Sequence, residues 1–281
     1  MEIDLSRDKI ACFIHSTTLE LWKDSFLIVL LDRLKDSGLL AKMSHVCVLN
    51  TGLPIDNKRL EEKYAPAQII HYNDNTLDFE NATIRALHTF AIFNPSYKIL
   101  YLHTKGVSYT PNHVFLPGIR SWNAYLLHSL VDNHVKCLRM LKIYDTVGCN
   151  YRPFEDGNGD HYSGNFWWAN ADYVRDLPVA YLKDKYHPEF WLLQNRPTFH
   201  NIHTIEHMYE QDYPEESYRE SVLRGLDDNV LYCQVGFPCT GLCNQLYNIA
   251  NALVMASTQK GNKVIILNDF LNDIALHMLE K

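Results

Sequence analysis

Four consecutive residues, His103-Thr104-Lys105-Gly106, combine groups that are able to bind an anion. They supply an imidazole, a hydroxyl and an ammonium, and they follow the apolar stretch Lys98–Leu102, which predicts a strand. Gly106 would let the backbone approach a ligand closely. Lys105 could therefore neutralise a leaving diphosphate, and stabilisation of such charge dominates many group transfers. By position alone, an ordinary solvated lysine in a turn is an equally good interpretation.

Carboxylates are the second requirement of such a transfer, because a base must take the proton of the attacking hydroxyl. Glu189 is a candidate for such a base, because Phe190 and Trp191 follow it and an aromatic neighbourhood would raise its pKa toward a useful range. A glutamate at a helix start, stabilised by the helix dipole, fits the same position. Asp160 and Asp156, at the ends of a Gly-Asn-Gly turn, are competing catalytic carboxylates or simply parts of a solvated turn.

Two further pairs of residues, each of which contains a threonine, are candidates for binding a nucleotide. Thr17 and Thr18 follow the first predicted strand, and Glu80 and Thr83 open the helix that precedes the fourth. Either pair equally fits a helix cap, because threonine favours helix starts whether or not a ligand is present.

Strands and helices alternate along the first part of the chain, and these elements must position the candidate residues. The predicted strands are Lys9–His15, His45–Asn50, Gln68–Tyr72 and Lys98–Leu102, and the predicted helices are Leu19–Leu40 and Asn81–Phe93. This alternation is typical of an α/β fold whose mainly parallel sheet is flanked by helices and binds ligands beyond the carboxyl ends of its strands. The residues after each strand are therefore expected to meet at one edge.

The rest of the chain predicts further elements, a connector and a short β-α-β fragment. The elements are a helix over Ser121–Leu141, strands over Tyr144–Asn150 and Tyr162–Ala169, a helix from Ala171, and the fragment formed by Asn229–Val235, Asn244–Gln259 and Lys263–Leu267. The acidic, apolar-poor stretch 209–228 predicts a connector. We therefore divide the chain into a domain over 1–208, the connector over 209–228 and the truncated start of a second domain over 229–281.

Composition narrows the function classes. The 281 residues carry 33 acidic and 26 basic side chains, a formal net charge of −7. This balance argues against a general nucleic-acid binder, because such proteins neutralise phosphates with clustered Lys and Arg. The N-terminus lacks a signal-peptide pattern, and the apolar run Phe26–Leu31 is too short for a transmembrane segment. We expect a cytoplasmic protein. The cysteines agree with this expectation, because the chain has seven and those in the first domain show no disulfide-like spacing.

Several ordered motifs resemble a family of GT-A-like glycosyltransferases found in bacterial polysaccharide loci and in large DNA viruses. The motifs are Ile99–Gly106, Val147–Asn150, His161–Pro178 and Pro188–Leu192, and the resemblance spans about residues 8–200. It implies a GT-A-type Rossmann-like fold and transfer of a sugar from a nucleoside-diphosphate sugar, by default a UDP-sugar, to a carbohydrate acceptor in glycan synthesis. It also implies that Ser163, Gly164 and Asn165 lie beneath the donor sugar and that Glu189 is the catalytic carboxylate. Trp167 and Trp168 point to opposite sides of their predicted strand, so one fits the core and the other could stack on a sugar or acceptor. Trp191 is a further candidate for acceptor binding, and each tryptophan equally fits a core position.

One departure from the family concerns the metal. GT-A enzymes usually end the fourth strand with Asp-x-Asp, which holds a divalent cation on the diphosphate, whereas His103-Thr104-Lys105 stands here. A charged lysine cannot ligate a hard cation but can replace one electrostatically. Metal-independent transfer and transfer assisted by Mn²⁺ or Mg²⁺ through His103 therefore both remain open.

The C-terminal segment Gly241–Leu246 is similar to the opening of some fucosyltransferases. The similarity implies continuation into a second, GT-B-type transferase domain and a bifunctional chain, although Cys243 replaces the usual glycine. Cys239 and Cys243 also have the spacing of a metal or redox pair.

Two rival interpretations stand beside the glycosyltransferase. His203-Thr-Ile-Glu206-His207 fits the H-x-x-E-H pattern of inverted zinc proteases, and it equally fits surface histidines on a helix. A carbohydrate-binding or scaffolding module that kept the fold without turnover is the second rival.

Overall fold

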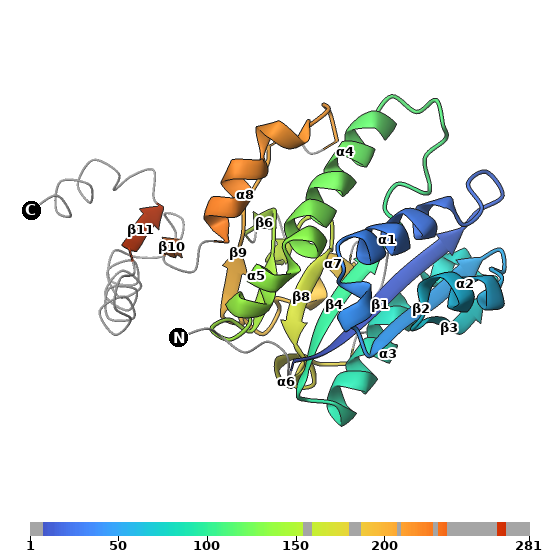
Figure 1. Ribbon diagram of the computed structural model, residues 1–281, viewed down its shortest axis with the longest axis horizontal. Helices are drawn as coiled ribbons and strands as arrows, with labels where there is room; N and C mark the ends of the chain where they lie inside the picture. The colour runs from blue at the N-terminus through green and yellow to red at the C-terminus, as the bar shows by residue number, and fades with distance from the viewer. Residues whose placement is uncertain are drawn as a thin grey trace, which may run out of the picture. The chain divides into compact units, whose positions relative to one another are not determined.

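The computed structural model describes residues 8–153, 159–179, 187–206, 209–226, 230–234 and 263–267. Its contacts group the chain into two units, Met1–Val222 and Leu223–Lys281 (Figure 1). No helix of the described part is both long and apolar enough to cross a bilayer.

The first unit is built on a seven-stranded sheet with the order β3-β2-β1-β4-β8-β5-β9. Only β8 pairs antiparallel with its neighbours, so the sheet is mainly parallel. The strands are β1 (Lys9–Thr18), β2 (His45–Gly52), β3 (Ala67–Asn73), β4 (Tyr97–His103), β5 (Thr146–Gly148), β8 (Trp167–Asn170) and β9 (Phe199–Asn201). The predicted α/β fold class, a Rossmann-like mainly parallel sheet flanked by helices, is confirmed.

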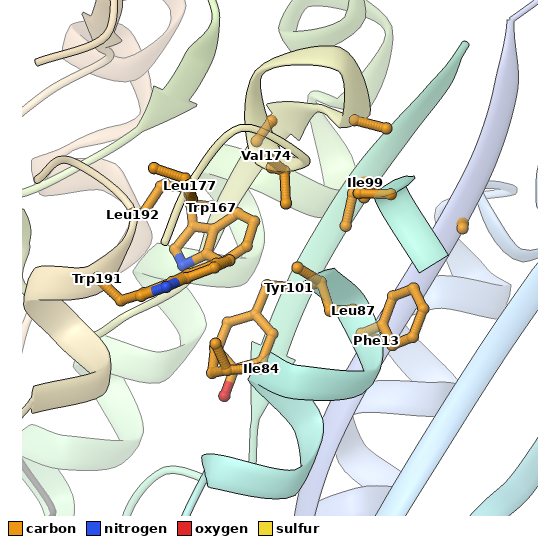
Figure 2. Close-up of a cluster of buried hydrophobic side chains, with 14 of the residues drawn as sticks. Phe13, Ile84, Leu87, Ile99, Tyr101, Trp167, Val174, Leu177, Trp191 and Leu192 are labelled. Atoms are coloured by element: carbon orange, nitrogen blue, oxygen red, sulfur yellow. The ribbon is translucent and has the colours of Figure 1, made fainter. Parts of the chain in front are cut away.

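Helices cover both faces of this sheet (Figure 1). One face carries α1 (Ser25–Asp36), α4 (Leu116–Leu127), a π-helical turn (His128–Asp132) and α5 (His134–Met140), and the other carries α3 (Asn81–Phe93), α6 (Ala171–Val174) and α7 (His187–Trp191). Successive strand residues point to opposite faces. Trp167 accordingly stacks on Tyr101 in the cluster beneath α3, with ring centroids 5.0 Å apart (Figure 2). Trp168 donates its indole N–H to the carbonyl oxygen of Leu130 on the opposite face.

Short elements complete the unit. They are α2 (Asn57–Tyr64), the two-residue strands β6 (Tyr151–Arg152) and β7 (His161–Tyr162), and 3-10 helices over Leu40–Lys42, Thr76–Asp78 and Glu215–Ser217. The helix predicted over Ser121–Leu141 begins earlier, at Leu116, and is interrupted by the π-helical turn, after which the Asn133 side chain donates to the carbonyl oxygen of His128. The helix predicted from Leu19 begins only at Ser25, because a tight turn with Lys23 at a positive φ precedes it.

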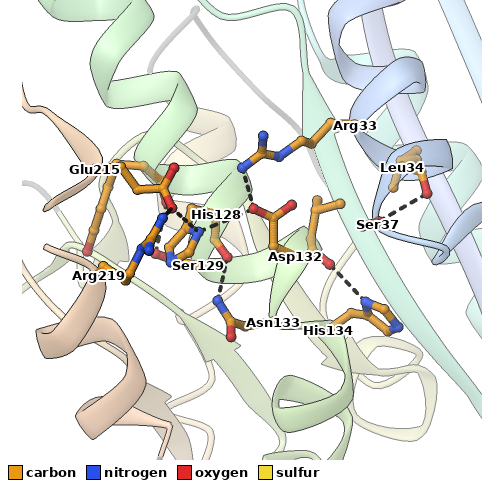
Figure 3. Close-up of polar contacts among 12 residues, drawn as sticks. Arg33, Leu34, Ser37, His128, Ser129, Asp132, Asn133, His134, Glu215 and Arg219 are labelled. Carbon is orange, nitrogen blue, oxygen red and sulfur yellow. Dashed lines mark hydrogen bonds and ion pairs between the residues drawn. The ribbon is translucent and has the colours of Figure 1, made fainter.

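The stretch predicted as a connector contributes packed residues to the first unit. Tyr218 and Val222 are buried, and α8 (Arg219–Gly225) begins here. Glu215 accepts hydrogen bonds from Arg219 and lies 3.7 Å from Nδ1 of His128, which in turn lies 3.2 Å from Asp132 (Figure 3). The polar cluster fixes this stretch to the π-helical turn, whereas the domain boundaries at 208 and 228 stay predictions.

In the second unit, β10 (Val230–Gln234) and β11 (Lys263–Leu267) form a parallel pair. The two strands lie where the sequence predicts them. The helix predicted over Asn244–Gln259, the Gly241–Leu246 segment and both Cys239 and Cys243 lie outside the described residues.

Candidate functional site

A cavity of about 320 Å³ opens where β1 and β4 end. It receives side chains from the ends of both strands, from the start of α3, from α4 and α7, and from the segment that follows β9. The lining comprises His15, Thr17, Phe79, Glu80, the run His103–Tyr109, Ile119, Trp122, Glu189 and Tyr209. The predicted tetrapeptide therefore faces a cavity at the carboxyl edge of the parallel strands, the place where α/β folds bind ligands.

The tetrapeptide is held rigidly against β1. The Thr104 backbone N–H donates to the His15 carbonyl oxygen at 3.0 Å, and the Thr104 hydroxyl oxygen accepts from the Thr17 backbone N–H at 2.9 Å. Gly106 has φ +92°, and a Cβ there would lie 2.8 Å from the Ile119 side chain, so glycine is required for this turn.

Lys105 supplies a cation to the cavity. Its Nζ lies 3.9 Å from the ring centre of Trp122, within cation–π range. Burial lowers the pKa of Lys105, while the charges of Glu189 and Glu80 raise it. Within the described part of the chain no carboxylate pairs directly with this ammonium. The charge is thus oriented by an aromatic ring and left available to an anionic ligand.

A buried carboxyl group lies directly behind the tetrapeptide. The Tyr101 hydroxyl and the Asn165 amide, at 2.7 Å, donate to Oε2 of Glu80, and Nδ1 of His103 lies 3.8 Å from Oε1. Burial raises the pKa of Glu80, against the lowering influence of His15, the Tyr101 hydrogen bond, Lys105 and Asn165. Burial, together with the charge of Lys105, lowers the pKa of His103 to about 4. Glu80 begins α3, yet its side chain makes no helix cap and joins this network instead.

Hydroxyl groups continue the network toward β2. Nδ1 of His15 lies 3.1 Å from the Thr83 hydroxyl, and Nε2 lies 3.3 Å from the Thr17 hydroxyl, which is 3.1 Å from that of Thr51. Among the predicted nucleotide residues, Thr17 therefore lines the cavity and Thr83 supports it from behind. Thr18 is buried and donates to the side-chain oxygen of Asn50, so it does not line the cavity.

Of the two predicted catalytic carboxylates, Glu189 and Asp160, only Glu189 lines the cavity. Glu189, in the first turn of α7, lines the cavity, and its Oε2 lies 3.9 Å from Nε2 of His161. Asp160 does not line the cavity, and its side chain forms a hydrogen bond with Tyr151. Asp156 lies outside the described residues. The structure therefore favours Glu189 as the carboxylate available to a ligand.

The predicted donor-sugar segment supports the cavity rather than lining it. The Gly164 carbonyl oxygen accepts from Nε2 of His103 at 2.9 Å, and a Cβ on Gly164 would lie 2.9 Å from Leu126 and 3.0 Å from Trp122. Ser163 and Asn165 are buried. The structure therefore does not display direct contact of these three residues with a sugar in this cavity, because Gly164 packs closely against α4 and the Asn165 side chain bonds Glu80 and Trp167.

The predicted acceptor-binding role of the tryptophans is wrong in the described structure. Trp167, Trp168 and Trp191 are only 1%, 0% and 4% exposed. Their indole N–H groups donate within the protein, to Asn165, Leu130 and Pro178 respectively. All three rings therefore belong to the core, where helices cover both faces of the sheet.

Other aromatic residues of the cavity are not evident from the sequence. Phe79, Tyr109, Trp122 and Tyr209 line the cavity. Trp122 lies within a helical apolar pattern that gives no sign of a ligand, and Tyr209 lies in a stretch predicted as a connector. Phe79 has a backbone φ of 47°, which is unusual for an aromatic residue and which the sequence does not reveal.

The side chains at the end of β4 fit a divalent cation poorly. Nε2 of His103 faces a carbonyl oxygen, Oε2 of Glu80 accepts two hydrogen bonds, and Lys105 adds a positive charge. Across the described ranges, no three His, Cys, Asp or Glu side chains gather in a way that could hold a metal ion. The H-x-x-E-H pattern is not helical at His203–Ile205, and His207 lies outside the described residues.

Comparison with known proteins adds a family but no activity. No curated protein matches the chain. A solved structure described as 4-diphosphocytidyl-2C-methyl-D-erythritol synthase is similar with a TM-score of 0.39 and 11% sequence identity, over 78% of this chain and 99% of that one. The profile of the family described as "Domain of unknown function (DUF8361)" matches residues 27–211, so the chain belongs to that family.

Proposed function

We propose that this protein is a glycosyltransferase that moves a sugar from a nucleoside-diphosphate sugar to a carbohydrate acceptor. One observation carries the proposal: the ammonium of Lys105 and the carboxylate of Glu189 face the same cavity at the carboxyl ends of β1 and β4. The first suits an anionic leaving group, and the second suits the proton of an attacking hydroxyl.

Each group has a defined task in the proposed reaction. The bond between the anomeric carbon and the diphosphate oxygen breaks, and the acceptor hydroxyl oxygen forms the new bond to that carbon. Glu189 takes the hydroxyl proton, while Lys105 stabilises the negative charge left on the diphosphate. Such a single displacement inverts the anomeric configuration.

The nucleoside of the donor, by default uridine, is assigned to the β1 side of the cavity. Thr17 offers a hydroxyl there, and the Thr17–Thr51 contact of 3.1 Å continues the polar surface toward β2. We assign no step to a metal ion, because Lys105 supplies positive charge where the related enzymes hold a cation. Continuation of the chain into a second, fucosyltransferase-like domain stays a prediction.

The test uses UDP and a panel of UDP-sugars. We expect thermal stabilisation by UDP and release of UDP from at least one sugar nucleotide, increased by a saccharide acceptor and retained in the presence of a chelator. Binding of UDP-sugars without any release, with acceptors present, would instead favour the carbohydrate-binding or scaffolding module. The absence of binding by every nucleotide in the panel would refute the proposed donor class.

A further inference from the structure

The segment that follows β9 runs along α4 in direct backbone contact. A Cβ placed on Gly118 would lie 2.5 Å from the carbonyl oxygen of Tyr209 and 2.9 Å from that of Gln211. These distances are too short for any side chain. Glycine at this position therefore allows the segment to approach the helix closely enough to reach the cavity.

Polar and aromatic contacts clamp the same segment. The Ser121 hydroxyl donates to the Tyr213 carbonyl oxygen at 2.7 Å and accepts from the Tyr213 backbone N–H at 2.6 Å. The rings of Phe115 and Tyr209 meet edge to face, with centroids 5.4 Å apart. Phe115, Gly118 and Ser121 are spaced three residues apart and so share one face of the helix. The position of Tyr209 is thus fixed by α4 and is not that of a free chain.

Tyr209 gives the cavity an exposed aromatic wall on one side. Its side chain is 45% exposed, whereas Trp122 on the same cavity is 6% exposed and is covered by Lys105. Glu189 lines the cavity too, while the threonines assigned to the nucleoside belong to β1 and β2. The proposed reaction takes place at Glu189, so the acceptor is assigned to this same cavity, in which Tyr209 offers an exposed aromatic ring.

We propose that Tyr209 forms a saccharide subsite, in which its ring packs against the C–H face of a pyranose and thereby positions the acceptor hydroxyl near Glu189. An aromatic ring presents a negative face that suits the weakly positive C–H groups of a sugar, and its hydroxyl remains available to water or to sugar hydroxyls. The role of this saccharide as the acceptor rests on the proposed function, whereas the binding of a saccharide at Tyr209 does not.

The test measures binding of a panel of methyl pyranosides by saturation-transfer difference NMR, together with UDP affinity by calorimetry. We expect at least one pyranoside to bind the wild type and Tyr209→Phe, and Tyr209→Ala to lose about tenfold or more in affinity, as an aromatic contact residue does. Tyr72→Ala is the matched control, because Tyr72 is 46% exposed on the edge strand β3 and does not line the cavity. UDP affinity should stay unchanged in every variant.

A second variant tests the clamp while keeping the tyrosine. Gly118→Ala should displace the segment and weaken saccharide binding without changing UDP affinity. Failure of every pyranoside to bind the wild type, or retention of affinity within about twofold in Tyr209→Ala, would overturn the subsite. Saccharide binding at Tyr209 without turnover of any nucleoside-diphosphate sugar would overturn the proposed function and leave the subsite standing.

Discussion

Nε2 of His103 donates a hydrogen bond to the backbone carbonyl oxygen of Gly164 at 2.9 Å, which joins the end of β4 to the loop before β8. A carbonyl oxygen only accepts, so Nε2 must carry the proton. In neutral His103 the lone pair is then on Nδ1, which lies 3.8 Å from Oε1 of Glu80. The imidazole serves the internal network behind the cavity, and Lys105 is left as the group that meets an anion.

The buried histidines predict loss of stability in acid. Burial lowers the pKa of His15 to about 4, although the charge of Glu80 opposes the shift. The pKa of His15 is lower in the folded state than in the unfolded state, so protonation of His15 favours unfolding. The free energy of unfolding is therefore unaffected by His15 above about pH 6.5 and decreases as the pH falls toward 4. For His15 the full loss is about 3 kcal/mol. The raised pKa of Glu80 acts in the opposite direction, since proton uptake there favours the folded state, and it offsets part of the loss.

Denaturant unfolding between pH 7 and pH 4 measures this effect. His15→Gln should flatten the decrease in the free energy of unfolding, whereas His71→Gln, at an exposed position on β3, should leave it unchanged. An equal decrease in both variants would show that His15 does not titrate as its burial implies.

Lys105→Ala tests the diphosphate assignment. A hydrogen bond to a charged group contributes about 1.5–3 kcal/mol, so we expect UDP affinity to fall by roughly 10- to 100-fold. Lys58→Ala is the control, because the Lys58 side chain is 85% exposed on α2. Calorimetric titration with UDP measures both variants. Unchanged affinity in Lys105→Ala, with the fold intact by circular dichroism, would remove Lys105 from the site.

The sequence predicts the sheet and its helices better than it predicts the residues that line the cavity. Alternation of apolar strands with periodic helices was enough for the sheet, and α3 begins and ends at the predicted residues Asn81 and Phe93. The tetrapeptide at residue 103 was found because strand ends of a parallel sheet share one edge. Tyr209 could not be found in this way, because its place depends on Gly118 and Ser121 of a helix distant in sequence. The sequence leaves the position of Trp167 open, since a core position and contact with a sugar fit it equally well.

Substitutions of Asn165 test the buried network. Asn165→Ala removes the donor to Glu80 and the acceptor for the Trp167 indole, and each unsatisfied buried group costs about 1–3 kcal/mol. Asn165→Asp keeps the acceptor and tolerates the φ of 52°, but it places a second carboxyl group beside Glu80. The destabilisation by Asn165→Asp should therefore be larger at pH 8 than at pH 5, and this difference should exceed that of Asn165→Ala, which removes one hydrogen bond to Glu80 but adds no second carboxyl group. A pH-independent penalty for the aspartate would contradict the proximity of the two carboxyl groups.

Glu189→Gln tests the base, and Asp160→Asn is its matched control because both replace a candidate carboxylate by an amide. Loss of a general base lowers turnover by about 10²- to 10⁴-fold, so kcat for acceptor-dependent UDP release should fall by that amount in Glu189→Gln. UDP affinity should change little, since the diphosphate is assigned to Lys105. Asp160 does not line the cavity, so Asp160→Asn should keep kcat near the wild-type value. If Glu189→Gln retained full turnover while Asp160→Asn lost it, the proton acceptor would have to be Asp160, and the cavity beside Lys105 would not be the place where the sugar is transferred.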